Sequence, residues 1–464
     1  MRSVISRLAR MVMLAVLLAT SLASPAAAQD GEIAVLRDTE TEYLFRDISR
    51  PLVQAAGLDP DSVHVVLLND PSINAFVATG QTVYIHSGLI QAADNVNQLQ
   101  GVIAHELGHV AGGHAIRIQQ GMGQATGITI ATLVLGALAI AAGAGEAGMG
   151  IMAAGQQAAL GSFLSFSRAQ ESSADQAGVK YLSAAGISGK GMIQFFSKLQ
   201  NQEYRLAIYA KDSYARTHPL SSERVQALTE QLRSDRSWGR PVDPNLEARF
   251  ERVKAKLWGF LDPRQAVTKY PESDQTVPGH YARALAYHMS AYPDKALSET
   301  ESLLRTDPND PFFLEFKGQT LLENGKPKDA IAPLREATQR SGDAPLIASM
   351  LGHALVATED RKNFSEAKDV LKVAVSRDNQ NPFAWYQLGI IYDREGDQGR
   401  AALATAERSN LENQPKLAFA SAQTAMRAIP AGSPDWLRAQ DIAMVSKTEL
   451  AKKDKRYRDR DEKN

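Results

Sequence analysis

Residues 103–110 read IAHELGHV and contain the pattern H-E-x-x-H. Two histidines four residues apart on a helix lie about 40° from each other around its axis, so both imidazoles can reach one cation. Glu106 directly follows the first histidine, where its carboxylate can lie beside a metal-bound water. Zinc lowers the pKa of such a water to about 7, which makes hydroxide available at neutral pH. The pattern therefore predicts a catalytic zinc site with His105 and His109 as ligands and Glu106 as general base.

The residues that flank this pattern favour a buried helix, which we expect from about Val96 to Gly112. Apolar side chains recur around the polar triplet with helical spacing. They are Leu99, Val102, Ile103, Leu107 and Val110. A short H-E-x-x-H also occurs by chance, so the alternative is a surface helix that merely carries two histidines.

A catalytic zinc site takes three protein ligands and leaves the fourth position to water. His114 is one candidate for the third ligand, but the corresponding pattern needs a histidine at the next position, which is Ala115. On a continued helix, His114 would point about 100° away from the required direction. Glu171 is the better candidate, because Asp175 shares its helix face and can accept the spare N–H of a ligating histidine. We therefore predict Glu171 as the third ligand and Asp175 as the residue that orients a ligand.

Three motifs together resemble the HtpX/Ste-type gluzincin peptidases. They are H-E-L-G-H at 105–109, R-x-x-E-x-x-A-D at 168–175 and H-P-x-x-x-x-R at 218–224. With an apolar leader before them and repeats behind them, the whole chain resembles the periplasmic β-barrel assembly-enhancing (BepA-like) members of that family. The resemblance implies zinc-dependent endoproteolysis and a role in the quality control of outer-membrane proteins.

The same resemblance implies roles for residues other than the three ligands. It places Arg224 near the active site as support, and His218 on a loop where it can act as a fourth, regulatory ligand that blocks the zinc. It also makes Asn74, Ala75 and Phe76 an exposed edge strand on which substrate lies extended. Considered without the resemblance, Arg224 is a surface ion-pair partner, His218 a turn residue and the strand an ordinary core strand.

The first 28 residues have the features of a cleaved secretory signal peptide. Three arginines precede an apolar segment at 11–22 and an A-x-A cleavage site at 26–28, so we expect a periplasmic protein. Removing residues 1–28, which contain no acidic residue, changes the formal net charge from −1 to −4. This charge excludes a basic nucleic-acid footprint. The lack of cysteine excludes disulfides and thiol catalysis.

Between residues 121 and 166 the only charged residue is Glu146. The apolar part from 128 to 142 is long enough to suggest a membrane span, but His109 and Glu171 lie on either side of it and must meet at one ion. A single span would separate them, and polar residues in the second half disfavour a second span. We expect Gly/Ala-rich helices that pack over the cleft and could touch a membrane surface or an unfolded client. A buried structural hairpin is the alternative.

Behind the catalytic region the chain repeats. Small residues recur at Ala284, Gly318, Gly352 and Gly389, with spacings of 34, 34 and 37. The segment 385–392 has the W-x-x-L-G-x-x-Y signature of a tetratricopeptide (TPR) repeat. Such repeats stack as helix pairs into a curved array with a concave face, which predicts a domain that recruits a partner or substrate.

These features divide the chain into a signal peptide (1–28), a zinc metallopeptidase domain (29–240), a linker and connecting helix (241–270), a TPR repeat domain (271–450) and a charged tail (451–464). Strand patterns occur only within the second of these parts, where the last two strands are expected to form a hairpin. The predicted fold class is α+β and mostly helical: a zincin-type metallopeptidase domain with a small β-sheet, followed by an all-α TPR solenoid.

The sequence thus predicts an endopeptidase that uses one Zn²⁺ per chain. By resemblance, its polypeptide substrates are unfolded outer-membrane proteins, which it degrades when they are misassembled and otherwise helps to assemble. The TPR domain is expected to contact the outer-membrane assembly machinery, and no nucleic-acid partner is expected. The alternative is a mainly non-catalytic chaperone or assembly scaffold that acts through the TPR domain.

Overall fold

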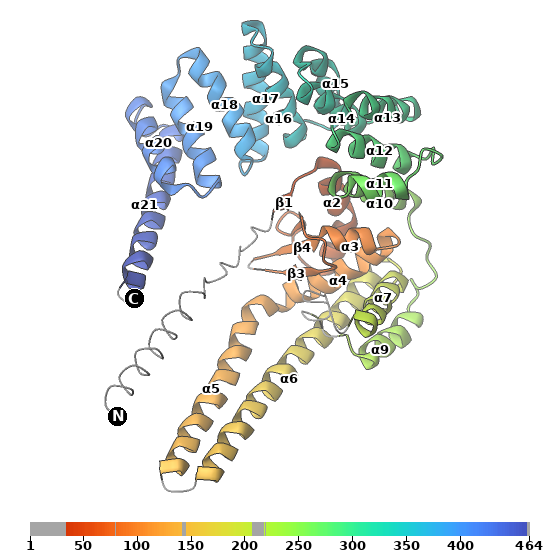
Figure 1. The fold of residues 1–464 in the computed structure, drawn as a ribbon, viewed down its shortest axis with the longest axis vertical. Coiled ribbons are helices and arrows are strands. Elements are labelled where there is room, and N and C mark those ends of the chain that lie inside the picture. The colour runs from red at the N-terminus through yellow and green to blue at the C-terminus, as the bar shows by residue number, and fades with distance from the viewer. Residues whose placement is uncertain (1–33, 79, 142–144, 207–217, 219, 462–464) are drawn as a thin grey trace, which may run out of the picture.

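The computed structural model describes residues 34–78, 80–141, 145–206, 218 and 220–461, so the expected signal peptide lies outside the described residues. Figure 1 shows three parts: a catalytic part around a small sheet, a long helical hairpin that points away from it, and a curved array of helices on its other side. The predicted fold class, mostly helical with a small sheet and a helical solenoid, is confirmed.

Four short strands form one mixed sheet in the order β1-β2-β4-β3. They are β1 (Val35–Leu36), β2 (His64–Leu68), β3 (Ala75–Val77) and β4 (Thr82–His86). β2 and β4 are parallel, whereas β3 and β4 form the expected antiparallel hairpin. β3 is therefore an edge strand, and β1 lies at the opposite edge.

Helix α4 (Val96–Gly112) is the central element of the catalytic part and has the expected bounds. The Asn95 side chain caps its first turn by accepting a hydrogen bond from Gln98 N, and every residue from Val96 to His109 is buried. The surrounding helices are α2 (Thr39–Ala55), α3 (Ser87–Ala92), α7 (Lys190–Leu206) and α9 (Ser222–Arg233). Their apolar side chains form one core with α4 and the sheet. A helix enclosed in this way can carry polar side chains only where they find partners.

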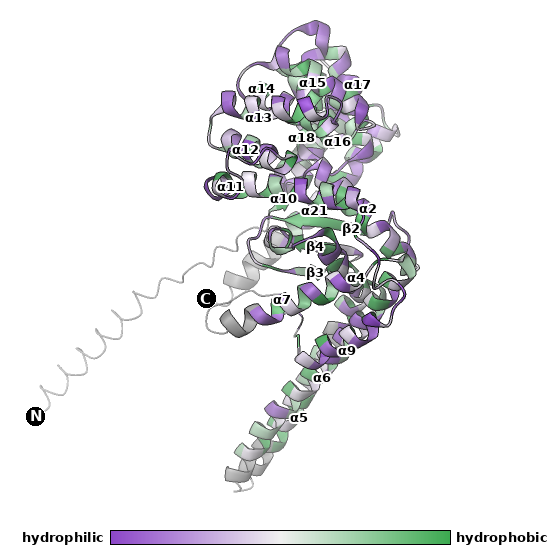
Figure 2. Ribbon diagram, turned by 90° about the vertical axis from the view of Figure 1, so that its right-hand side faces the viewer, coloured by the Kyte–Doolittle hydropathy of each residue, from purple (hydrophilic) through white to green (hydrophobic). Residues whose placement is uncertain are grey.

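Helices α5 (His114–Ala141) and α6 (Gly145–Ala185) form the long hairpin. The expectation that residues 121–166 pack over the cleft is wrong, because this part of the hairpin projects away from the catalytic part (Figure 1). It is not a buried hairpin either, since small residues pack its two helices on each other and leave apolar outer faces exposed. A Cβ added at Gly155 would lie 1.9 Å from Thr132 Oγ1. Figure 2 shows apolar residues along both arms. The large hydrophobic side chains that are at least 41% exposed here are Ile116, Met122, Ile130, Leu133, Val134, Leu135, Met149, Leu160 and Leu164.

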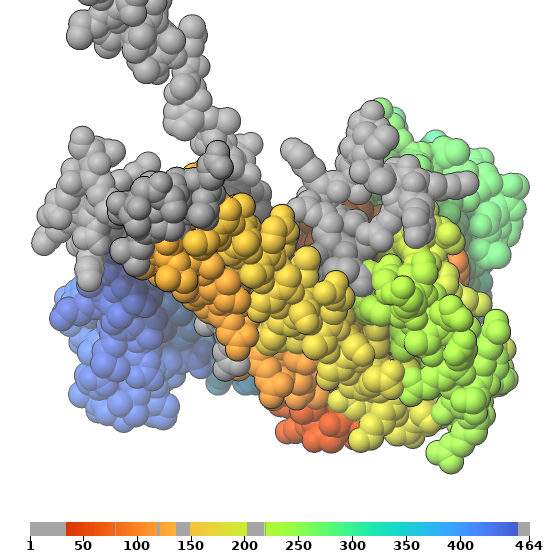
Figure 3. All heavy atoms as spheres, turned by 90° about the horizontal axis from the view of Figure 1, so that it is seen from below, coloured from red at the N-terminus to blue at the C-terminus, as the bar shows by residue number. Residues whose placement is uncertain are grey.

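The face of the molecule that carries the hairpin is seen from below in Figure 3. Helices α5 and α6 occupy its middle, with the C-terminal helices on one side and α9 on the other. Despite its apolar surface, the hairpin has no arm that could cross a bilayer: among the described residues no helix combines the necessary length and apolarity.

The TPR array consists of paired helices with the expected repeat spacing. Gly318 packs against Leu334 of its paired helix, where an added Cβ would lie 2.4 Å from Leu334 Cγ. The longer third repeat accommodates its extra residues around a short 3-10 turn, η1 (Arg361–Asn363). The paired helices are α12 (Val277–Met289) with α13 (Pro293–Thr306), α14 (Pro311–Glu323) with α15 (Pro327–Arg340), α16 (Pro345–Ala357) with α17 (Phe364–Arg377), α18 (Pro382–Glu395) with α19 (Gln398–Leu411), and α20 (Pro415–Ala428) with α21 (Pro434–Asp461).

Helix α10 (Pro244–Leu261) joins the two domains and is followed by the short α11 (Pro263–Lys269). Although this helix was expected to be part of a connecting segment, its Phe250, Val253 and Leu257 are buried in the catalytic core. The same helix also packs on α12 of the first repeat. A rigid helix with both contacts fixes the TPR array to the catalytic part.

Buried charges strengthen this junction. Arg252 of α10 lies 2.7 Å from Glu40 Oε1 and 2.7 Å from Asp310 Oδ2. The Tyr281 hydroxyl donates a hydrogen bond to Glu40 Oε2 at 3.0 Å, and Lys256 Nζ lies 3.2 Å from the same oxygen. Because removing one partner of a buried pair leaves an uncompensated charge, this network favours a single arrangement of the two domains.

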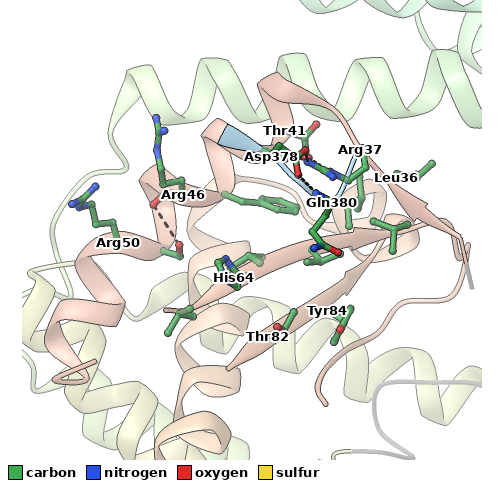
Figure 4. Close-up of a pocket in the computed structure, with 18 of the residues that line it drawn as sticks. Leu36, Arg37, Thr41, Arg46, Arg50, His64, Thr82, Tyr84, Asp378 and Gln380 are labelled. Atoms are coloured by element: carbon green, nitrogen blue, oxygen red, sulfur yellow. Dashed lines mark hydrogen bonds and ion pairs between the residues drawn. The ribbon is translucent and has the colours of Figure 1, made fainter. Parts of the chain in front are cut away.

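A cavity of about 820 Å³ opens between the outer side of the sheet and the loop before α18. Figure 4 shows that residues from both domains line it, including Arg46, His64 and Tyr84 from the catalytic part. Arg37 and Asp378 join the two sides with an ion pair of 3.0 Å. The lining includes none of the predicted zinc ligands, so this cavity is separate from the metal centre.

Candidate metal centre

The two histidines of the H-E-x-x-H pattern project from one face of α4 into the catalytic core. His105 is fully buried and His109 is 8% exposed. Their Nε2 atoms lie 3.1 Å apart, which follows from their spacing of one helical turn. Each ring therefore directs one nitrogen toward a shared point.

Glu171 of α6 lies opposite this pair of nitrogens. Its Oε2 is 3.4 Å from His105 Nε2, and its Oε1 is 3.4 Å from His109 Nε2. The absence of a side chain at Gly108 permits the two helices to approach, since a Cβ there would lie 2.6 Å from Ala174 O. The structure thus brings the predicted third ligand to the two histidines.

His218 is the fourth residue of the group. It precedes α9, and its Nδ1 lies 3.1 Å from Glu171 Oε1 and 3.3 Å from His105 Nε2. One donor atom from each of His105, His109, Glu171 and His218 falls within 4.8 Å of all the others, and all four residues are buried.

The donor set fits a zinc ion. Bonds of about 2.0–2.1 Å in a tetrahedral arrangement place neighbouring donor atoms about 3.3 Å apart. Five separations that join His105 to His109 and to His218, and Glu171 to each of the three histidines, are 3.1 to 3.4 Å and agree with this value. Three imidazoles and one carboxylate are also typical zinc donors. A site with all four positions filled by protein corresponds to a closed form.

Asp175 and Arg224 support the ligands from behind. Asp175 Oδ1 lies 3.0 Å from His105 Nδ1, which leaves Nε2 of that ring for the metal. Arg224 of α9 donates to both oxygens of Asp175, at 2.8 and 2.9 Å, and its Nη2 lies 3.3 Å from Glu171 Oε2. Asp175 is therefore placed to orient a ligand and Arg224 to hold both carboxylates.

Glu106 lies beside His218, the fourth residue of the group. Its side chain is fully buried, and its Oε1 is 3.6 Å from His218 Nε2. A carboxylate at this place can reach a reactant that takes the position of His218, which is the arrangement that a general base requires.

The charges of the site shift the pKa values of its members in different directions. Burial opposes protonation of His105, but Asp175 and Glu171 outweigh it and raise the pKa of His105 to about 10. Burial and the neighbouring His105 lower the pKa of His109 to about 2. Burial opposes ionisation of Glu171, but contacts with His105 and His218 lower its pKa below the usual range. Because the pKa of His105 is raised, a cation that binds at this ring must compete with a proton.

His114, the rejected candidate for the third ligand, is not one of the four converging residues. It nevertheless lies in the site, because its Nδ1 is 2.9 Å from His109 Nδ1. This contact was not predicted from the sequence. The glycine pair at 112 and 113 directly before it was the available signal, since glycines favour a reversal of the chain at the end of a helix.

The segment Asn74, Ala75 and Phe76 lies at the edge of the sheet that includes β3. Ala75 is buried, whereas the Phe76 ring stacks on Tyr84 at 5.2 Å on the outer side. One side of β3 pairs with β4, and no other strand of the described residues pairs with its second side. An edge of this kind can bind an extended polypeptide.

Comparisons with known proteins agree with this geometry. A model described as peptidase family M48 matches residues 39–232. The beta-barrel assembly-enhancing protease of Yersinia pestis is 25% identical over 86% of this chain and 81% of its own length. The protein of that name from Escherichia coli K12 is 26% identical over 66% of this chain and 63% of its own length. Metalloprotease LoiP of the same strain is 30% identical over 44% of this chain and 75% of its own length. The chain thus spans less than two thirds of the length of the Escherichia coli K12 protein.

Proposed function

Because this chain belongs to peptidase family M48, we propose that it is a zinc-dependent endopeptidase. The observation that carries the proposal is the convergence of His105, His109 and Glu171 on one point beside the carboxylate of Glu106. Zinc, when bound there, would supply a Lewis acid that polarises the substrate carbonyl and activates water.

Side chains of this chain would transfer the proton during hydrolysis and hold the metal ligands in position. The Glu106 carboxylate takes the proton from the water that attacks the peptide carbon, and it returns a proton to the amine nitrogen when the C–N bond breaks. Asp175 keeps His105 in the tautomer with its hydrogen on Nδ1. Arg224 holds Asp175 and Glu171 in place, which supports the ligands without contact with the reacting atoms.

We assign His218 a regulatory role. With zinc bound, its Nδ1 would take the position that a catalytic zinc site keeps for water, and the described arrangement would be a resting form. Movement of His218 away from Glu171 would open the fourth position beside Glu106. Such a step is a conformational change of the kind that partner binding can bias.

We also propose periplasmic location and outer-membrane proteins as substrates. This follows from the expected signal peptide and from the name of the Yersinia pestis and Escherichia coli relatives. An edge strand such as β3 can bind an unfolded polypeptide in an extended form through backbone hydrogen bonds. The TPR array would recruit the client or the assembly machinery, and the exposed apolar side chains of the hairpin would provide peripheral contact with a membrane.

The closed metal site favours one second candidate. If His218 never leaves the fourth position, the chain would act mainly as a chaperone or assembly scaffold through its TPR domain. A comparison of the wild type with Glu106→Gln separates the two. For an endopeptidase, Glu106→Gln keeps one zinc ion per chain and loses hydrolysis of casein, because the base and not a ligand is removed. Equal hydrolysis by both proteins would refute the proposed role of Glu106. Full cellular function of Glu106→Gln would favour the scaffold.

A further inference from the structure

The turn between α4 and α5 folds a histidine back onto the metal centre. Helix α4 ends at Gly112, and Gly113 has a φ of +62°, which reverses the chain. His114, the first residue of α5, is then buried against the last turn of α4 and is only 4% exposed. A Cβ added at Gly112 would lie 2.3 Å from His114 Nε2. Both glycines are therefore needed to admit this ring.

The ring of His114 meets His109 on the side away from the other ligands. The two Nδ1 atoms are 2.9 Å apart, and the rings are nearly perpendicular at 80°. In the described part of the chain, His114 is the hydrogen-bond partner of His109 Nδ1, whereas Nε2 faces His105 and Glu171. The contact thus lies behind the ligand and not at the metal position.

Only one of the two tautomers of this pair is compatible with a metal at His109. A ligating Nε2 must offer its lone pair, so the hydrogen of His109 resides on Nδ1 and is donated to the lone pair of His114 Nδ1. His114 then carries its own hydrogen on Nε2. The reverse tautomer would place a hydrogen on His109 Nε2 and block the metal.

We propose that His114 is the positioning residue of His109: it fixes the tautomer and the ring orientation of this ligand, as Asp175 does for His105. The inference rests on the proposed metal centre. It gives each histidine of α4 a support from another element, and the support of His109 is the first residue of the projecting hairpin. Helix α5 is thus joined to the metal centre through this hydrogen bond, whereas α6 reaches it through Glu171 and Asp175.

The experiment measures the zinc affinity of the full chain by competition with a chelator. His114→Leu removes the acceptor and should weaken zinc binding 10- to 100-fold, as expected for loss of such a partner. Binding at saturation should still reach one zinc ion per chain, because the ligands remain. His114→Asn places an amide oxygen near the position of Nδ1, so we expect its affinity within about threefold of wild type.

Two further variants make the result specific. His114→Gln is polar, but its longer side chain carries the amide near the position of Nε2, out of reach of His109, so it should bind as weakly as His114→Leu. It also tests the inference if His114→Leu does not fold. His353→Leu in α16 removes a histidine of the TPR array and should leave zinc affinity unchanged.

The possible outcomes separate this inference from the proposed function. Wild-type affinity in folded His114→Leu or His114→Gln would overturn the role of His114 and leave the metal centre intact. Equal weakening in His114→Asn and His114→Gln would also overturn it, because the hydrogen bond would then not be the cause. No zinc binding by the wild type would refute the metal centre itself.

Discussion

Arg224 of α9 forms a bidentate ion pair with Asp175 of α6. Its Nε and Nη2 atoms lie 2.8 and 2.9 Å from the two carboxylate oxygens. Both side chains are largely buried, at 13% and 4% exposure. Through Asp175 the pair reaches His105, so α9 is connected to the metal centre although none of its own residues converges there.

Replacing Arg224 with Ala should therefore destabilise the catalytic part. The buried Asp175 carboxylate would lose its partner, which costs about 3–5 kcal/mol in the free energy of unfolding. Arg224→Lys should recover only part of this free energy of unfolding, because lysine cannot form the bidentate ion pair. Chemical denaturation of the zinc-free proteins measures the effect. Arg233→Ala, an exposed change on the same helix, should stay within about 0.5 kcal/mol of wild type. Similar values for both alanine variants would show that the pair does not support the site.

Replacing His218 with Ala should raise proteolysis, including self-cleavage, without a loss of zinc. The reason is that three protein ligands remain and the fourth position becomes available. Casein hydrolysis and metal content, measured on the same preparation, test this. Loss of activity with zinc retained would instead identify His218 as a group that stabilises the transition state, and the regulatory role would have to be abandoned.

The position of α10 predicts where the chain can be cut to separate the catalytic part from the TPR array. A fragment of residues 29–262 should be soluble and bind zinc, whereas one of 29–240 lacks Phe250, Val253 and Leu257 of the core. Each buried side chain of this kind contributes about 1.5–3 kcal/mol. Thermal unfolding and zinc titration of the two fragments test the boundary. Equal stability would mean that α10 belongs with the TPR array.

Local patterns in the sequence were sufficient for α4 and for the two histidines, because residues four apart on one helix must share a face. Glu171 could be proposed because Asp175 lies one turn beyond it. The position of His218 and Arg224 near the metal centre depends on packing between segments that are far apart in the sequence. It was therefore predicted only from the resemblance to the peptidase family. The contact of His114 could not be read from helical geometry, since the turn at Gly113 breaks the helix on which that geometry was calculated.

The surroundings of the hairpin and of α10 could not be predicted from the sequence either. Apolar composition indicated that residues 121–166 are helical, but not whether other elements would cover them. A connecting helix was expected within 241–270, and only the tertiary structure reveals that apolar side chains of α10 complete the catalytic core.

The domain junction should give the protein a pH-dependent stability. Burial, reinforced by the nearby Asp38 and Glu40 and opposed by Lys256, raises the pKa of Glu315 to about 8. Between pH 4.5 and about 8 the unfolded chain releases this proton while the folded chain retains it, so stability falls as pH rises through this range. Glu315→Gln should reduce that fall, and thermal unfolding of both proteins at pH 5.5 and 8 measures it. The same difference between the two pH values in both proteins would contradict the assignment.

The zinc content of purified full-length protein tests the metal centre most directly. Wild type and Glu106→Gln should each contain one zinc ion per chain, since neither lacks a ligand. In a His218→Ala background, which keeps three ligands, Glu171→Ala should contain little or no zinc, because it removes the carboxylate that lies 3.4 Å from both histidine nitrogens and leaves only two ligands. Full zinc occupancy in this double variant, or none in the wild type, would contradict the assignment of His105, His109 and Glu171 as the ligands.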